Sequence, residues 1–181
     1  MKIIRIIAVF LMVLLTFCGC GAGQDISFEY SQRAFECEMS WEWEGTRYRA
    51  ELTVGDTSDT AAERDISLSF SEPASLCGVR VERIDGNERI SLGETVFEGA
   101  DVSGLLGVAE LFRTDGKMVE SSLVTLSGEN INLVKLRFDD GGEISVYLSG
   151  KSGTPVRICG LVGVRETQID ILRFEMKMPR E

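Results

Sequence analysis

The sequence predicts a mainly β (α+β) domain, in which a single strongly curved antiparallel sheet packs against one helix. Three observations lead to this fold class. Apolar and polar residues alternate over much of the chain, as they do in half-buried strands. Turn residues separate the alternating runs at the spacing of hairpins. One run, residues 101–116, carries apolar residues at helical spacing instead.

The first alternating stretch, residues 35–54, predicts a β-hairpin with a two-residue turn at positions 44–45. This turn aligns three cross-strand pairs, which are Trp41 with Tyr48, Glu42 with Arg47, and Met39 with Ala50. In this register the apolar residues of both strands share one face and the charged residues share the other. The register is therefore strongly specified.

The remaining strands follow from the same alternation and from glycine-containing turns. After a polar loop at 55–64, we expect a strand at 66–70, a proline-led turn at 71–78 and a hairpin turning at 85–87. A short strand at 95–98 precedes the helix. Strands resume at 118–126, at 130–149 with a turn at 139–142, at 153–163 and at 167–176. Hairpin connections of this kind favour one antiparallel sheet.

The helix expected over 101–116 begins with Asp101 as its cap, has Arg113 in its last turn and ends at Gly116. Its apolar positions leave little polar surface, which predicts that the helix is covered nearly all round. Gly104 and Gly107 each lower helix stability by about 1 kcal/mol relative to alanine. They serve either close packing or mobility of the helix as a lid, and the sequence leaves both open.

The N-terminus predicts export. Residues 1–19 have a basic start and an apolar run of twelve residues, which is the pattern of a signal peptide and shorter than the about 20 residues of a transmembrane helix. The stretch LLTFCGCG resembles the lipobox of bacterial lipoproteins, and Cys20 is the expected lipidation site because the small Gly19 precedes it. Phe17 departs from the leucine that the family prefers. An ordinary secreted protein is the alternative.

Composition limits the partners of the exported chain. Without residues 1–19, the chain keeps 17 Lys and Arg against 29 Asp and Glu, a net charge near −12. Such a surface repels nucleic acid and anionic headgroups, so the expected membrane link is a diacylglyceryl group on Cys20. We expect residues 20–34 to be a tether and residues 35–181 to be one domain. Cys37, Cys77 and Cys159 are then buried thiols, or the last two form a disulfide.

The sequence contains no signature of an enzyme, a cofactor or a metal site. It has no histidine, which excludes Ser-His-Asp systems and histidine-ligated zinc. It also has no Cys-x-x-Cys and no phosphate-binding glycine loop. Glu36, Glu38 and Glu42 lie on the water side of a strand, where they ionise alike instead of dividing acid and base roles. We therefore expect a protein that binds without catalysis.

The order of these elements resembles the lipoprotein-carrier (LolA/LolB-like) superfamily. The likeness covers residues 34–175 and depends on the tryptophan-rich hairpin, the segment ISLSFSEPASLCGVRVE, the central helix, GGEISVYLSGKSGTPVRI and the last strand. It implies a β half-barrel whose helix lies on the concave face, with acyl chains held there in some members. An N-terminal anchor departs from a freely diffusing carrier.

Two functions remain open from the sequence. The first is a membrane-anchored envelope protein outside the cytoplasmic membrane that binds a lipid, acyl chain or lipopeptide. The residues expected to line its site are Met39, Trp41, Trp43, Tyr48, Leu105, Ala109 and Phe112. The second is an envelope interaction or regulatory module, in which the same residues form a permanently filled core and the partner is another protein.

Overall fold

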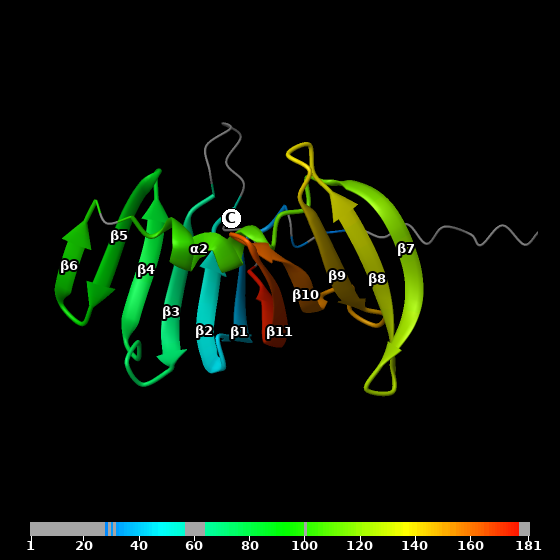
Figure 1. The fold of residues 1–181 in the computed structure, drawn as a ribbon, viewed down its shortest axis with the longest axis horizontal. Helices are drawn as coiled ribbons and strands as arrows, with labels where there is room; N and C mark the ends of the chain where they lie inside the picture. Colours follow the sequence, from blue (N-terminus) through cyan, green and yellow to red (C-terminus); the bar gives the residue numbers. More distant parts are fainter. Residues whose placement is uncertain (1–27, 29, 31, 57–63, 100, 178–181) are drawn as a thin grey trace, which may run out of the picture.

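The computed structural model describes residues 28, 30, 32–56, 64–99 and 101–177. This part of the chain forms eleven strands and one short helix (Figure 1). Their bounds are β1 Phe35–Trp43, β2 Thr46–Val54, β3 Ile66–Glu72, β4 Val79–Ile84, β5 Asn87–Leu92, β6 Thr95–Glu98, α2 Ser103–Glu110, β7 Lys117–Leu126, β8 Glu129–Arg137, β9 Glu143–Ser149, β10 Pro155–Val162 and β11 Arg165–Met176.

All eleven strands belong to one antiparallel sheet, in the order β6-β5-β4-β3-β2-β1-β11-β10-β9-β8-β7. The sheet is open, with β6 and β7 at its two ends. Consecutive strands are neighbours within each half, and the pairing of β1 with β11 joins the halves. The segment containing α2 runs from β6 at one end to β7 at the other (Figure 1). The predicted mainly β architecture with a single antiparallel sheet and one helix is therefore confirmed.

The first hairpin has the register that the sequence predicts. Trp41 lies opposite Tyr48, Glu42 opposite Arg47, and Met39 opposite Ala50. Glu44 and Gly45 both have positive φ angles, 54° and 73°, as a type I′ hairpin turn requires. This turn matches the twist of the strands, and it holds Glu44 in a backbone conformation that is uncommon for residues other than glycine.

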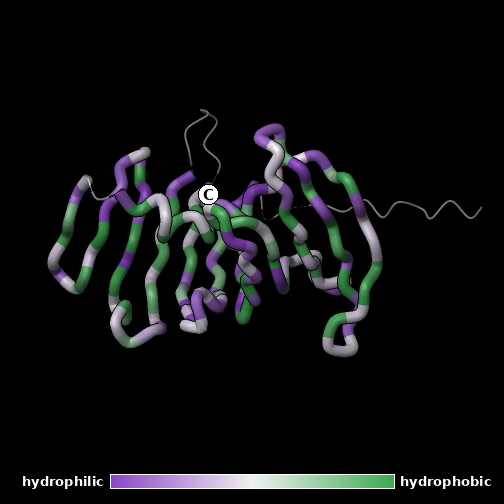
Figure 2. The backbone as a smooth tube through the Cα atoms, viewed as in Figure 1, coloured by the Kyte–Doolittle hydropathy of each residue, from purple (hydrophilic) through white to green (hydrophobic). Residues whose placement is uncertain are grey.

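The core lies on one face of the sheet. Figure 2 shows hydrophobic and hydrophilic residues alternating along the strands. The apolar residues of one face form a continuous buried cluster across both halves, and α2 contributes Leu106, Val108 and Ala109 to it. The opposite face carries cross-strand ion pairs, such as Glu38 with Arg49. These exposed pairs contribute about 0–1 kcal/mol each, so packing of the apolar face is the main source of stability.

The helix is shorter than the sequence predicts. It spans Ser103–Glu110, its N-cap is Val102, and Asp101 instead accepts hydrogen bonds from the amide and hydroxyl of Ser103 at 3.2 and 2.7 Å. Arg113 lies beyond the helix, because its guanidinium stacks 3.7 Å from the centre of the Phe138 ring and pairs with carboxylates outside α2. The predicted cap at Asp101 and the predicted end at Gly116 are therefore wrong.

The described part of the expected tether belongs to the folded domain. Tyr30 is only 1% exposed, and its ring meets those of Phe35 and Phe174 edge-on, with centroids 6.0 and 5.8 Å apart. Phe28 packs beside it. The domain therefore begins before Phe35. The predicted signal peptide and Cys20 lie outside the described residues. Where the structure describes the chain, no helix has the length and apolarity needed to cross a bilayer.

Cys37, Cys77 and Cys159 are free thiols in this structure, so the disulfide considered between the last two is not formed. Cys37 is buried in the core and Cys77 is exposed. Burial raises the pKa of the Cys37 thiol well above its usual range. Burial also raises the pKa of Cys159. Cys77 is therefore the thiol among the three that solvent reaches best.

Candidate functional site

A cavity of about 510 Å³ lies between the start of α2 and the first hairpin. Five parts of the chain line it: the end of β1 with its turn, β2, β3, the start of α2 and the first residue of β11. The lining residues are Trp41, Trp43, Glu44, Tyr48, Phe70, Asp101, Gly104, Leu105, Val108 and Arg165. Its size is within the range of small-molecule sites, about 300–1,000 Å³.

The sheet side of the cavity is aromatic. The rings of Trp41 and Tyr48 are stacked, with centroids 5.4 Å apart and planes 12° apart, because the two residues are directly opposite in the hairpin. Phe70 from β3 approaches the Trp41 ring at 6.1 Å. Trp43 and Tyr48 are partly buried, so part of their ring surface remains accessible. Four aromatic residues thus present an apolar surface to the cavity.

Trp41 is only 5% exposed, and its indole Nε1–H has no hydrogen-bond acceptor among the described residues. A buried donor without an acceptor destabilises a fold by about 1–3 kcal/mol. Tryptophans in protein interiors usually find a partner for this group. This buried, unpaired donor therefore lowers the stability of the hairpin beside the cavity.

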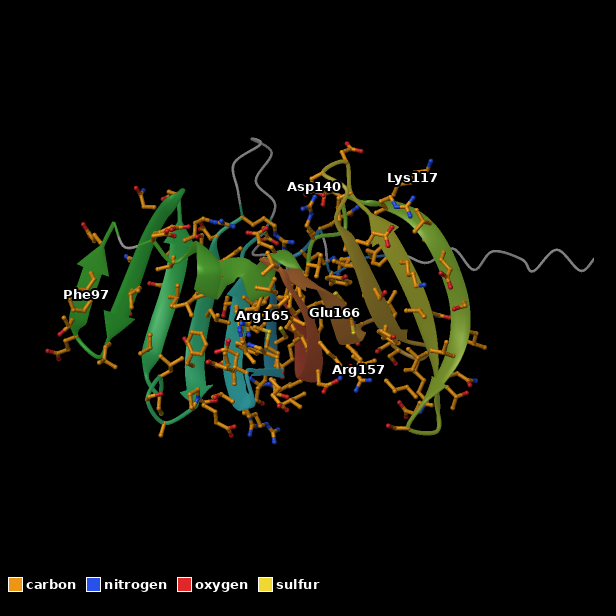
Figure 3. All side chains as sticks on the ribbon, viewed as in Figure 1. Phe97, Lys117, Asp140, Arg157, Arg165 and Glu166 are labelled. Atoms are coloured by element: carbon orange, nitrogen blue, oxygen red, sulfur yellow. The ribbon has the colours of Figure 1, made fainter. Side chains whose placement is uncertain are left out.

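Three charged side chains surround the aromatic wall. Arg165 forms an ion pair with Glu44, with Nη2 and Oε1 2.5 Å apart. The guanidinium of the same arginine lies 5.8 Å from the centre of the Trp43 ring, in a cation–π contact. Arg165 occupies the middle of the sheet (Figure 3). Hydrogen bonds from the Ser103 hydroxyl and amide lower the pKa of Asp101, so this carboxylate is ionised at neutral pH.

The structure brings together four of the seven site residues that the sequence predicts. Trp41, Trp43, Tyr48 and Leu105 line the cavity. Ala109 and Phe112 line a different cavity of about 400 Å³, together with residues that include Phe35, Arg64 and Arg83. Met39 is fully buried in the core, between Ala50 of β2 and Ile171 of β11. The seven residues thus lie in three places, namely the two cavities and the core, and ligand binding by any of them stays a prediction.

The sequence did not identify Phe70, Val108, Glu44, Asp101 or Arg165 as members of the site. The position of Phe70 could have been predicted, because it is the last apolar residue of an alternating strand whose apolar residues face the core. Arg165 had none, since it is far from Glu44 in the sequence and reaches it through the pairing of β11 with β1.

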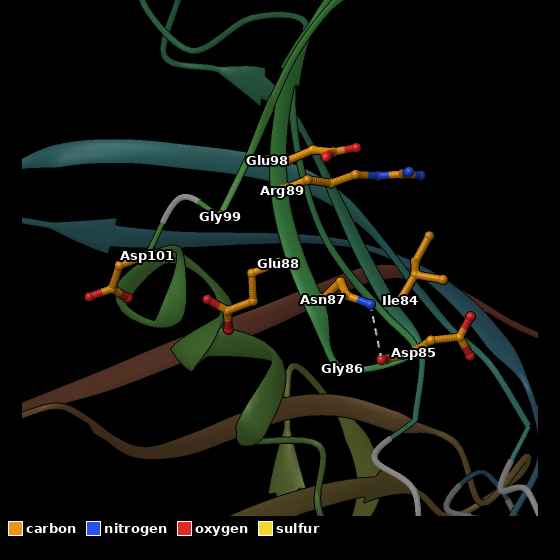
Figure 4. A pocket seen from close by; sticks show the side chains of 9 residues that line it. All are labelled: Ile84, Asp85, Gly86, Asn87, Glu88, Arg89, Glu98, Gly99 and Asp101. Carbon is orange, nitrogen blue, oxygen red and sulfur yellow. Dashed lines mark hydrogen bonds between the residues drawn. The ribbon is translucent and has the colours of Figure 1, made fainter.

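A larger cavity of about 860 Å³ lies at the turn between β4 and β5 (Figure 4). Its lining is polar, and several of its side chains already stabilise the backbone. The Asn87 amide donates to the Asp85 carbonyl oxygen at 3.3 Å, and a Glu88 oxygen accepts from the Val102 amide at 3.2 Å. The Glu88 contact ties β5 to the start of α2, so this carboxylate has a structural role.

The cavity beside the first hairpin is suited to binding. Its aromatic and aliphatic side chains provide apolar contact area, and three charged residues, Glu44, Asp101 and Arg165, are part of its lining. Among the described residues, no three Cys, Asp or Glu side chains come close enough to hold a metal ion. The arrangement fits an amphipathic ligand with an apolar body.

No protein-family model and no curated protein matches the sequence. Among solved structures, the chain is similar to an uncharacterized conserved protein from Thermus thermophilus, with 12% identity, a TM-score of 0.50 and 82% of each chain covered. It is also similar to a DUF1329 family protein from Desulfovibrio piger, with 10% identity, a TM-score of 0.47, and 84% of this chain and 89% of that chain covered.

A LolA superfamily protein from Nitrosomonas europaea matches with 9% identity, a TM-score of 0.41, and 83% of this chain and 89% of that chain covered. At these identities the similarity concerns the fold. The chain shares its overall fold with the T. thermophilus protein.

Proposed function

We propose that this chain is a non-catalytic lipoprotein of the cell envelope that binds a hydrophobic ligand, a lipid or an acyl chain, beneath α2. In this proposal the face of the sheet that α2 covers is the concave face. The helix supports this arrangement because it contacts both β4 and β10, which four other strands separate in the sheet. The protein is anchored outside the cytoplasmic membrane through Cys20.

The observation that carries the proposal is the aromatic cavity. Trp43 and Tyr48 of the first hairpin and Leu105 of α2 line this cavity, and all three side chains are incompletely buried. Burying a methylene group contributes roughly 0.8 kcal/mol, so an acyl chain with about ten buried methylenes gains near 8 kcal/mol before the costs of association.

Native mass spectrometry of the full chain extracted from bacterial membranes tests the proposal. We expect a lipid that leaves on gentle activation, unlike a covalent anchor. Leu105→Glu places a charge in the cavity wall and is expected to abolish this adduct. Leu172→Glu is the matched control, because Leu172 is 47% exposed on β11 and does not line the cavity. Absence of a releasable lipid from the native chain would contradict the proposal.

The anchor has a separate test. Labelling with radioactive palmitate is expected for the native chain and for Cys18→Ala, because the lipobox resemblance places the acylated residue at Cys20. Cys20→Ala is expected to remain unlabelled. A Cys20→Ala chain that still incorporates palmitate would show that the anchor site is elsewhere.

A second function, binding of an envelope protein with the cavity permanently filled, is favoured by the edge strand β7. This strand is ten residues long and, within the described part of the chain, pairs only with β8. Leu123 and Val119 are 65% and 43% exposed on it. Such an edge can accept a strand of another protein. Crosslinked pull-down from envelope extract is expected to return the same partner repeatedly and to lose it with Leu123→Lys. No reproducible partner would count against this function.

A further inference from the structure

The cavity beside the first hairpin combines aromatic rings with an excess of negative charge. The charged residues in its lining are the carboxylates Glu44 and Asp101 and the guanidinium of Arg165. The pKa of Asp101 is lowered by its hydrogen bonds to Ser103, so it adds a full negative charge near neutral pH. An anionic headgroup entering this cavity meets two carboxylates, whereas a cationic one is attracted.

A cation already lies on the aromatic surface of this cavity. The Arg165 guanidinium is 5.8 Å from the centre of the Trp43 ring and pairs with Glu44. The side chains of Arg165 and Glu44 are 49% and 65% exposed. Ion pairs this exposed are weak, since water replaces them at little cost. A ligand cation can therefore replace the guanidinium without a large penalty.

We propose that this cavity binds a quaternary ammonium group, which takes the place of Arg165 against Trp43 and Tyr48 and is balanced by Glu44 and Asp101. Aromatic rings recognise such cations through their negative faces, and the methyl groups add apolar contact. This inference rests on the proposed ligand site and specifies its headgroup. Choline chemistry occurs both in lipid headgroups and in free solutes, and the experiment separates these two sources.

The first measurement compares choline with 3,3-dimethylbutan-1-ol, its uncharged isostere, on the full chain in a non-ionic detergent. The chain contains two tryptophans, and both line the cavity, so intrinsic fluorescence reports on this site. We expect choline to bind at least about fivefold more tightly than the isostere, because only choline has a charge for the rings and carboxylates. Equal affinities would overturn the headgroup assignment, while releasable lipid in mass spectrometry would still support the ligand site.

The source of the ammonium group is distinguished with dodecylphosphocholine below its micelle-forming concentration. If the group belongs to a lipid, this amphiphile binds far more tightly than choline, because its alkyl chain also fills the cavity. If the natural ligand is a free solute, the two bind alike. Both outcomes keep the ammonium site, and failure of both probes to change the fluorescence would refute it.

Two substitutions have opposite expected effects. Arg165→Gln removes the competing cation and should tighten choline binding, whereas Glu44→Gln removes a balancing charge and should weaken it, each by about threefold to tenfold. Arg173→Gln is the control: Arg173 lies on the same strand, is similarly exposed at 52%, and pairs with Glu51 away from the cavity. Thermal unfolding confirms that each variant is folded. Weaker choline binding by Arg165→Gln, or unchanged binding by Glu44→Gln, would overturn the proposal.

Discussion

Gly104 and Gly107 lie three residues apart in α2 and have different surroundings. A Cβ atom added at Gly107 would lie 3.0 Å from Cγ1 of Val162, whereas one added at Gly104 meets no atom of the described residues within 4 Å. Carbon atoms pack best about 3.5–4.0 Å apart, so alanine at position 107 requires the helix or Val162 to shift by roughly 0.5 Å. Val162 is buried and β-branched, which leaves it few other rotamers.

The expected free energies of unfolding follow from these distances. Gly104→Ala gains helix propensity and is expected to stabilise the protein by about 0.5–1 kcal/mol. Gly107→Ala gains the same helix propensity but introduces overpacking, which costs about 1–3 kcal/mol. It should therefore destabilise the protein by roughly 0–2 kcal/mol. In a Val162→Ala background the obstructing methyl group is absent, and Gly107→Ala should become stabilising. The two substitutions at positions 107 and 162 are thus strongly coupled.

Urea unfolding of the full chain, followed by tryptophan fluorescence, measures these differences. The four chains needed are the two single glycine variants, Val162→Ala and the double variant, each compared at an unchanged m-value. Equal stabilisation by Gly104→Ala and Gly107→Ala would refute the reasoning. It would mean that α2 does not pack closely against β10 at Gly107 and that a mobile lid fits better.

Three further outcomes are expected from other parts of the fold. Iodoacetamide at pH 8 should modify Cys77 in the folded protein and leave Cys37 unmodified, since burial raises the pKa of the Cys37 thiol. Peptide mass mapping measures the modification of both cysteines. Gly160→Ala should destabilise the protein by about 1–3 kcal/mol, because its Cβ would lie 2.8 Å from Leu111 and 2.9 Å from Ile144. A free energy of unfolding equal to that of the native chain would contradict this close packing. Glu82→Gln should destabilise the protein by about 1–2 kcal/mol, since the buried carboxylate pairs with the half-exposed Arg80 and Arg89. A thermal midpoint within error of the native one would show that these ion pairs contribute nothing to stability.

The local part of the fold was readable from the sequence because its signals are local. Alternation with a period of two identified the strands, and the Glu44-Gly45 turn fixed the register of the first hairpin. The extent of α2 was not readable in the same way. Arg113 suits the last turn of a helix, but contacts with Phe138 and with carboxylates outside α2 hold it beyond the helix end. Tyr30 likewise follows a polar segment, and only its aromatic neighbours explain its burial.

Four of the ten residues that line the candidate site were predicted, for the same reason. Trp41, Trp43 and Tyr48 share a face by the period of a strand, so their proximity follows from one hairpin. Arg165 belongs to the site because β1 pairs with β11 and, when that register is continued, the start of β11 lies beside the first turn. No pattern within either segment specifies that pairing.

The sequence by itself determined the strand-rich architecture, the first hairpin with its register and the acidic character of the chain, since alternation, turn residues and charge are properties of neighbouring residues. Tertiary structure alone decided the strand order, the length of α2 and the group of charges around the cavity. The physical reason is that contacts between distant segments depend on which apolar faces pack together, and many segments of this chain have equally apolar faces.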